Sequence, residues 1–169
     1  MSIYKEMGFQ PKKESTSEAA LYNIVRTFTL FNRLFQRHYV PFDLTPAKLN
    51  VLMLVKHVGE EAGLPQREIA KRLIISGSDV TGLIDRLEKE GLLTRRGASG
   101  DRRIKLIKIT AKGSALLDQL WPSHMEQIVL VMAPLSMKEQ EQLIALLTKI
   151  RMRLQNKDGT EAHSNNQKT

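Results

Sequence analysis

Residues 92–109 restrict the fold more than any other part of the sequence, because two short apolar stretches there flank a loop of small and basic residues. The first stretch, 92–96, begins with two leucines. The second, 103–109, alternates apolar and polar residues until Ile107 breaks the pattern. Gly97 and Gly100 supply turn residues between the two stretches. The segment is therefore predicted to form a β-hairpin with a Gly/Ser loop.

Two short amphipathic helices are predicted directly before this hairpin. Pro65 opens the first, and Ser76 can cap the second, which runs over 77–90. Two helices joined by a tight turn and followed by a hairpin make a winged helix-turn-helix. In that arrangement the second helix fits the major groove of DNA, and the hairpin, or wing, reaches phosphates. The residues expected to point inward are Ile69, Ala70, Leu73, Val80, Leu83, Ile84 and Leu87.

Longer helical patterns flank this central part. Apolar residues recur at helical spacing over 21–35, and Thr45 supplies an N-cap for a helix that follows. After the hairpin, Thr110 caps a long apolar helix, which Pro122 is expected to kink or interrupt. A capping box over 136–139 then starts a last helix.

The net charge of +8 lies mainly in the middle of the chain. Residues 65–113 contain 12 lysines and arginines against 6 acidic residues, whereas residues 114–169 contain 6 of each. Charge alone is compatible with a solvated basic face. On a short hairpin, however, so many like charges are unfavourable unless a polyanion neutralises them, so we predict that this region binds double-stranded DNA.

The predicted DNA contacts lie on helix 77–90 and on the hairpin. The outward face of the helix begins with small polar residues, which allow close approach to base edges, and the five cations of the hairpin can contact phosphates. Asp101 cannot favour DNA, and we expect it to pair with a neighbouring arginine and fix the shape of the wing. The predicted DNA-binding residues are Ser76, Ser78, Thr81, Gly82, Arg86, Arg95, Arg96, Arg102, Arg103 and Lys105.

Two alternatives use the same pattern. Helix 77–90, taken by itself, could be an ordinary amphipathic surface helix. A winged domain can also serve as a protein-interaction module without direct DNA readout, although such a module has no use for a cationic wing. Salt separates the two functions, since DNA binding weakens steeply with ionic strength and hydrophobic docking does not.

Several residue types and motifs are absent from the sequence, and their absence argues against several classes of function. Cysteine is absent, which excludes disulfides, thiolate zinc sites and cysteine-based redox sensing, and the four histidines are scattered, so we predict no metal site. No Gly-rich phosphate loop, nucleophile elbow or H-E-x-x-H occurs, so we predict no enzyme activity and no cofactor. The polar first ten residues are unlike a signal peptide, and no apolar run approaches the ~20 residues that span a bilayer. We therefore expect a cytoplasmic protein without membrane contact.

Three stretches at a fixed joint spacing are more specific than the helix or the hairpin alone. Residues 76–93 (SGSDVTGLIDRLEKEGLL) are followed by residues 100–103 (GDRR) and then by residues 109–113 (ITAKG). These stretches resemble the recognition helix, the D-x-R wing signature and the L-T-x-x-G helix start of the MarR family of bacterial winged helix-turn-helix transcriptional regulators. Ile109 stands in place of the usual leucine. The resemblance covers about residues 20–155.

The resemblance implies a homodimer that places two winged domains on one palindromic operator, with the first and last two helices interleaved. It also implies that Ser78 and Thr81 lie near base edges, Arg86 near a phosphate, and Arg103 near the minor groove. Gly82 occupies a position where a larger residue is common. The implied function is that of a sequence-specific DNA-binding transcriptional regulator, with repression as the expected mode.

The terminal helices indicate a dimer independently, because they carry more apolar residues than a two-helix brace on a small domain could bury. We predict a mainly α-helical fold with a small β-hairpin wing, in which a winged helix-turn-helix is joined to dimerisation helices. The predicted parts are a loose N-terminal arm (1–16), an N-terminal dimerisation helix (17–44), a winged helix-turn-helix domain (45–110), C-terminal dimerisation helices (111–156) and a disordered tail (157–169).

A small-molecule site is a further implication of the resemblance, since many members of this family release DNA when a small aromatic or lipophilic acid binds between the dimerisation helices and the winged domain. An aromatic stripe at helical spacing is also compatible with plain core packing. The candidate ligand-binding residues are Phe28, Phe31, Phe35, Arg37 as an anion partner, His38, Tyr39, Met53, His57 and Trp121.

Overall fold

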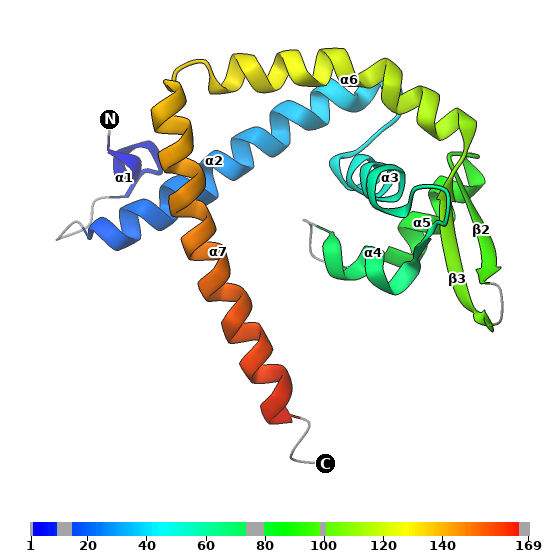
Figure 1. Ribbon diagram of the computed structural model, residues 1–169. Coiled ribbons are helices and arrows are strands. Elements are labelled where there is room, and N and C mark those ends of the chain that lie inside the picture. The colour runs from blue at the N-terminus through cyan, green and yellow to red at the C-terminus, as the bar shows by residue number, and fades with distance from the viewer. Residues whose placement is uncertain (1, 10–14, 74–79, 99–100, 166–169) are drawn as a thin grey trace. The chain divides into compact units, whose positions relative to one another are not determined.

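The computed structural model describes residues 2–9, 15–73, 80–98 and 101–165, except the side chains of 98, 101–103 and 157–165. The fold is mainly α-helical with a small antiparallel sheet, as predicted (Figure 1). The chain divides into two compact units, Met1–Trp121 and Pro122–Thr169. The elements are α1 (Ile3–Glu6), α2 (Thr16–Tyr39), the 3₁₀ turn η1 (Val40–Phe42), α3 (Pro46–Gly59), β1 (Leu64–Pro65), α4 (Gln66–Arg72), α5 (Val80–Lys89), β2 (Leu93–Ala98), β3 (Asp101–Ile109), α6 (Ala111–Met132) and α7 (Met137–Asn165).

The core of the first unit is built from α3, α5, the sheet and the start of α6. Thr45 caps α3 as predicted, accepting a hydrogen bond from the backbone N–H of Lys48 at 3.2 Å. The prediction that Ala70 points inward is wrong, since Ala70 is exposed on α4. The buried residue of this short helix is Ile69. The most deeply buried side chains are Val51, Leu52, Val55, Ile69, Ile84, Leu87, Leu93, Ile107, Leu117 and Leu120.

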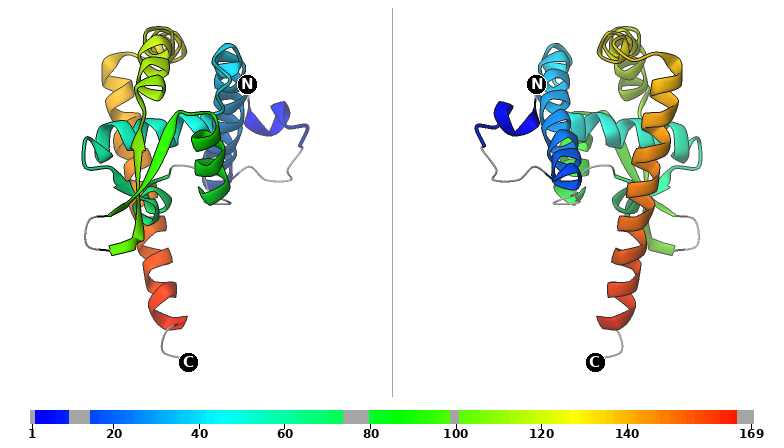
Figure 2. Two further views of the ribbon diagram at one scale, coloured as in Figure 1. Left: turned by 90° about the vertical axis from the view of Figure 1, so that its right-hand side faces the viewer. Right: turned by 90° about the vertical axis from the view of Figure 1, so that its left-hand side faces the viewer.

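The sheet has three antiparallel strands in the order β1-β3-β2, and the long hairpin of β2 and β3 is seen in green in Figure 2. β2 and β3 form the predicted hairpin, which we call the wing, with Leu93 opposite Ile109. β1 is a strand that the sequence analysis missed, because two residues are too few to show alternation. Leu64 of β1 pairs with Ile107, so Ile107 lies in the central strand and is fully buried. This position explains why an apolar residue interrupts the alternation there.

The N-terminal residues correct the prediction of a loose arm over 1–16. Residues 3–6 form α1, and Tyr4 is only 2% exposed. Its hydroxyl oxygen lies 2.9 Å from the carbonyl oxygen of Ser15 and 3.2 Å from Oε2 of Glu18. Its ring packs edge-on against Tyr22, with centroids 5.9 Å apart. One aromatic side chain therefore anchors α1 on α2, although the segment is too polar and short for its sequence to show periodicity.

We expect Tyr4→Ala to release α1 from α2. Cleavage by trypsin after the exposed Lys5 should become about tenfold faster, because cleavage follows local opening and the substitution removes the ring packing and the hydrogen bond that oppose it. Mass spectrometry of the N-terminal fragment over time measures this rate. Tyr4→Phe, which keeps the ring, should give an intermediate rate. A wild-type rate for Tyr4→Ala would contradict the anchoring role.

The last two helices begin where predicted, and α7 ends later than predicted. α6 reaches Met132 as predicted and is not interrupted at Pro122, because a proline removes one backbone hydrogen bond of a 22-residue helix without ending it. α7 starts at the predicted capping box, where the Ser136 hydroxyl donates to Glu139 Oε2 at 2.6 Å and the Ser136 N–H donates to the same oxygen at 2.8 Å. The hydroxyl, and after it the N–H, lower the pKa of that carboxyl. α7 continues to Asn165, past the predicted end of the last helix at 156. The disorder of the tail stays a prediction. Within the described part of the chain, no helix is long and apolar enough to cross a membrane.

The junction between the wing and α6 is closely packed. The hydroxyl oxygen of Thr110 accepts a hydrogen bond from the Gly113 N–H at 3.0 Å and lies 2.7 Å from the carbonyl oxygen of Gly91, to which it donates. Gly113 approaches the backbone of Leu92 so closely that a β-carbon would lie 2.3 Å from the Leu92 carbonyl oxygen. The T-x-x-G pattern thus combines a helix cap with a residue small enough for this contact.

Candidate nucleic-acid interface

α5 presents several of the side chains predicted to contact DNA, and we call it the recognition helix. Val80, Ile84 and Leu87 are buried against the core, which leaves Thr81 and Arg86 exposed on the opposite face. Gly82 is half-buried. The predicted contacts at positions 76 and 78 lie outside the described residues.

Gln66, which the sequence analysis missed, lies beside the recognition helix. Its side-chain nitrogen Nε2 donates a hydrogen bond to Oγ1 of Thr81 at 2.8 Å. This bond joins the first residue of α4 to the first turn of the recognition helix, so it orients the Thr81 hydroxyl on the exposed face. The one sequence signal for Gln66 is its place directly after Pro65, at the start of a helix.

The wing carries exposed cations on both of its strands. Arg96 of β2 and Lys105 of β3 are exposed. Arg96 pairs with Leu106 and Lys105 pairs with Gly97, so the two cations point to opposite faces of the hairpin. Arg102 and Arg103 belong to β3, but their side chains, like that of Asp101, lie outside the described residues. The predicted pairing of Asp101 with an arginine therefore stays a prediction.

Arg95 differs from the other predicted phosphate contacts, because its guanidinium turns back to the recognition helix. Its NH2 group forms an ion pair with Asp85, and its Nε lies 3.6 Å from Oε2 of Glu88. Three-quarters of the Arg95 side chain is covered. Arg95 therefore links β2 to the outer face of the recognition helix, and its single positive charge lies close to both acidic residues of that helix.

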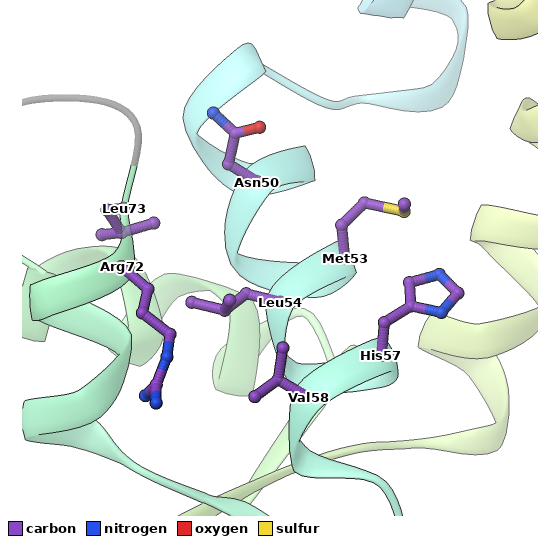
Figure 3. Close-up of a pocket in the computed structure, with 7 residues that line it drawn as sticks. All are labelled: Asn50, Met53, Leu54, His57, Val58, Arg72 and Leu73. Carbon is purple, nitrogen blue, oxygen red and sulfur yellow. The ribbon is translucent and has the colours of Figure 1, made fainter. Parts of the chain in front are cut away.

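An apolar pocket of about 270 Å³ lies between α3 and the end of α4 (Figure 3). Of the candidate ligand residues, Met53 and His57 line it. Arg72 adds a cation at its rim and forms an ion pair with Glu68 at 2.7 Å. Hydrogen bonds from Lys71 and then Arg72 lower the pKa of Glu68 below its ordinary value. The pocket residues that the sequence analysis missed are Asn50, Leu54, Val58, Arg72 and Leu73.

The other candidate ligand residues lie elsewhere. Tyr39 is buried, its burial raises the pKa of the phenol to about 12, and its ring stacks on Phe35 with centroids 5.9 Å apart. These two rings belong to the core and its border rather than to the pocket. Phe28 is 61% exposed on α2. The remaining candidates outside the pocket lining are Phe31, Arg37, His38 and Trp121. Among the described residues, no three His, Cys, Asp or Glu side chains are grouped to hold a metal ion.

Comparison with known proteins identifies the family. A family model described as MarR matches residues 42–104, which span α3 to the beginning of β3. The chain is also 32% identical over 133 residues to the HTH-type transcriptional regulator YkoM of Bacillus subtilis (strain 168), and the match covers 75% of this chain and 83% of YkoM. The chain belongs to the MarR family. Its fold and its helix-turn-helix are those of a DNA-binding transcriptional regulator of this family.

Solved structures of MarR-family proteins share the fold. The DNA complex of MepR from S. aureus is 27% identical, with a TM-score of 0.70 and a match that covers 83% of this chain and 99% of MepR. CouR from Rhodococcus jostii RHA1, bound to p-coumaroyl-CoA, is 25% identical, with a TM-score of 0.69 and coverage of 82% of this chain and 95% of CouR. Proteins of this fold are therefore known in complex with DNA, as for MepR, and with a small molecule, as for CouR.

Proposed function

We propose that this MarR-family protein is a cytoplasmic repressor that binds a palindromic operator as a homodimer and is released by a small aromatic or lipophilic ligand. The observation that carries the DNA-binding part is the recognition helix with exposed Thr81 and Arg86, followed directly by a wing with exposed Arg96 and Lys105. A winged helix-turn-helix domain binds DNA with two components, a helix that fits the major groove and cations that reach phosphates. The DNA complex of MepR supports the same use of this fold.

The proposed residue roles follow from exposure and partners. Thr81, oriented by Gln66, faces base edges in this proposal, and Arg86, Arg96 and Lys105 contact phosphates. The arginines at 102 and 103 extend the same cationic wing. Arg95 has a different role in the proposal from the one the sequence predicts: its ion pairs with the recognition helix hold the wing in position.

Exposed apolar side chains on the terminal helices support the homodimer. None of the described side chains from 122 to 156 is buried, although α7 is rich in aliphatic residues. A helix with so much apolar surface in water is unfavourable unless another surface covers it, and a two-fold dimer covers both copies at once. The exposed apolar residues of α2 and α7 include Leu21, Val25, Phe28, Leu143, Ile144, Leu146, Leu147, Ile150 and Leu154.

The pocket beside α3 supports a ligand in this proposal. Its lining is mainly apolar and carries His57 and Arg72, which suit a lipophilic molecule with a polar or anionic group. The p-coumaroyl-CoA complex of CouR supports ligand binding by proteins of this fold.

Selection of bound fragments from the source genome tests the DNA-binding proposal and defines the operator. The bound fragments should share an inverted repeat with half-sites about one helical turn apart, and affinity should fall steeply with salt. Light scattering at micromolar concentration should report a dimer. Failure to enrich any genomic fragment would favour the interaction-module alternative, and a monomer would contradict the homodimer.

A further inference from the structure

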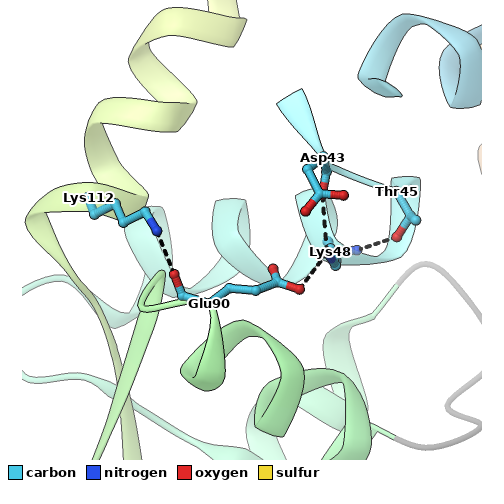
Figure 4. A network of polar contacts seen from close by, with 5 residues as sticks. All are labelled: Asp43, Thr45, Lys48, Glu90 and Lys112. Atoms are coloured by element: carbon cyan, nitrogen blue, oxygen red, sulfur yellow. Dashed lines mark hydrogen bonds and ion pairs between the residues drawn. The ribbon is translucent and has the colours of Figure 1, made fainter. Parts of the chain in front are cut away.

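Two lysines hold the C-terminal end of the recognition helix from two sides (Figure 4). Nζ of Lys48, on α3, lies 2.7 Å from Oε1 of Glu90. Nζ of Lys112, in the first turn of α6, donates a hydrogen bond to the backbone carbonyl oxygen of Glu90 at 2.8 Å. Glu90 is thus the residue through which both neighbouring helices contact this end.

The recognition helix ends in a regular C-cap. The Leu92 N–H donates to the Leu87 carbonyl at 2.9 Å and the Gly91 N–H donates to the Glu88 carbonyl at 3.0 Å, while Gly91 has φ +72°. This is a Schellman motif with Glu90 as the last half-helical residue. The stop itself needs no carboxylate at Glu90, and a negative charge there opposes the helix dipole. Another interaction must therefore account for Glu90.

Lys48 supplies that interaction and connects it to a second element. Its Nζ also donates to the backbone carbonyl oxygen of Asp43 at 3.1 Å, and its side chain is only 11% exposed. Asp43 lies at the end of η1 with φ +50°, where the chain leaves α2 and turns into α3. One largely covered ammonium group therefore ties this turn, α3 and the recognition helix together.

We propose that Lys48 and Glu90 are a positioning pair that sets the orientation of the recognition helix for DNA binding. The proposal rests on the proposed role of that helix in reading DNA. With its last residue fixed, the helix keeps a defined angle, and that angle determines where the exposed residues of its first turns meet the groove. Neither side chain is proposed to touch DNA. The pair acts through Thr81 and Arg86, which do in the proposed function.

Lys48→Met and Glu90→Gln test this pair on the full-length protein, with the operator found by fragment selection. Each substitution should raise the dissociation constant for operator DNA about tenfold. The double variant should bind no more weakly than the worse single variant, because both substitutions remove the same contact. The slope of log affinity against log salt should stay at the wild-type value, since no phosphate contact is lost. Lys48→Arg, which restores the cation, should recover most of the affinity.

Lys56→Met is the matched control. Lys56 also lies on α3, but its ion pair, with Asp118 at 2.5 Å, joins α3 to α6 and not to the recognition helix. This variant should bind DNA within about twofold of wild type. Stoichiometric titration with operator DNA, at a temperature below the melting temperature of every variant, measures the fraction of protein that can bind. It therefore separates altered affinity from loss of folded protein.

Four results would overturn the positioning pair: wild-type affinity in Lys48→Met, additive losses in the double variant, a salt slope lowered by about two units (one phosphate contact in each protomer), or an equal loss in Lys56→Met. A lowered slope would make Lys48 a phosphate contact instead. The proposed function fails differently, since the wild-type protein would then show no salt-dependent binding to any genomic fragment.

Discussion

Replacing Arg86, Arg96 and Lys105 together by alanine is expected to lower affinity about a thousandfold for each operator half-site at physiological salt. All three cations are exposed, one on the recognition helix and two on neighbouring strands of the wing. A charge-assisted contact with a phosphate contributes about tenfold in affinity, so three independent contacts multiply to that factor. Each lost contact also lowers the salt slope by about 0.9, and the proposed homodimer loses six contacts, so the triple variant should lose about five units.

Fluorescence anisotropy with a labelled operator, over 50–300 mM salt, measures both quantities. A triple variant at Lys138, Lys149 and Arg153 is the matched control, because these exposed α7 cations change the net charge equally. The control should keep the wild-type slope, and its dimer should be checked by light scattering. An unchanged slope in the Arg86, Arg96 and Lys105 variant would refute the phosphate contacts. An equal loss of affinity in the control would show that the effect comes from net charge and not from contacts at these three positions.

Gly113→Ala should be the most destabilising single substitution discussed for this chain. Its β-carbon would lie 2.3 Å from the Leu92 carbonyl oxygen and 2.9 Å from Cγ1 of Ile109. The oxygen belongs to backbone that also accepts a hydrogen bond from the Thr110 N–H at 3.1 Å, so it cannot move without cost. Overpacking of this kind costs about 3 kcal/mol, which exceeds the gain of ~1 kcal/mol from placing alanine in a helix.

Thermal unfolding followed by circular dichroism checks this result. A net loss of ~2 kcal/mol corresponds to a melting temperature lower by about 4–8 °C for a chain of this length. Gln119→Ala, at an exposed position of the same helix, should change it by less than ~2 °C. A melting temperature for Gly113→Ala at or above the wild-type value would show that the junction relaxes around the added methyl group.

The sequence predicts the architecture well where periodicity, caps and turn residues agree. The hairpin, the Thr110 cap, the capping box at Ser136 and the left-handed Gly91 follow from local chemistry, and the structure has them. β1 and α1 were missed or mispredicted for a common reason. Each depends on a partner distant in sequence, β1 on β3 and Tyr4 on Tyr22, while its own residues are too few for a pattern.

The candidate site was predictable in its location and less so in its partners. Exposure of Thr81 and Arg86 follows from helical periodicity, because the opposite face is apolar. The ion pairs of Arg95 join a strand to a helix, and the hydrogen bond of Gln66 joins two helices. Contacts of this kind depend on how elements pack, and residue type alone cannot distinguish an arginine that is free to bind phosphate from one that is already paired.

The ion pairs of Arg95 have a consequence for attempts to change which DNA sequence a protein of this kind reads. Transplanting residues 80–89 alone into a relative would move Asp85 and Glu88 without Arg95, the residue that pairs with both. A graft should therefore include β2 together with the recognition helix. Gln66 of α4 and Lys48 of α3 contact this segment from outside it, so under the proposed function a change of DNA sequence preference also has to preserve those two contacts.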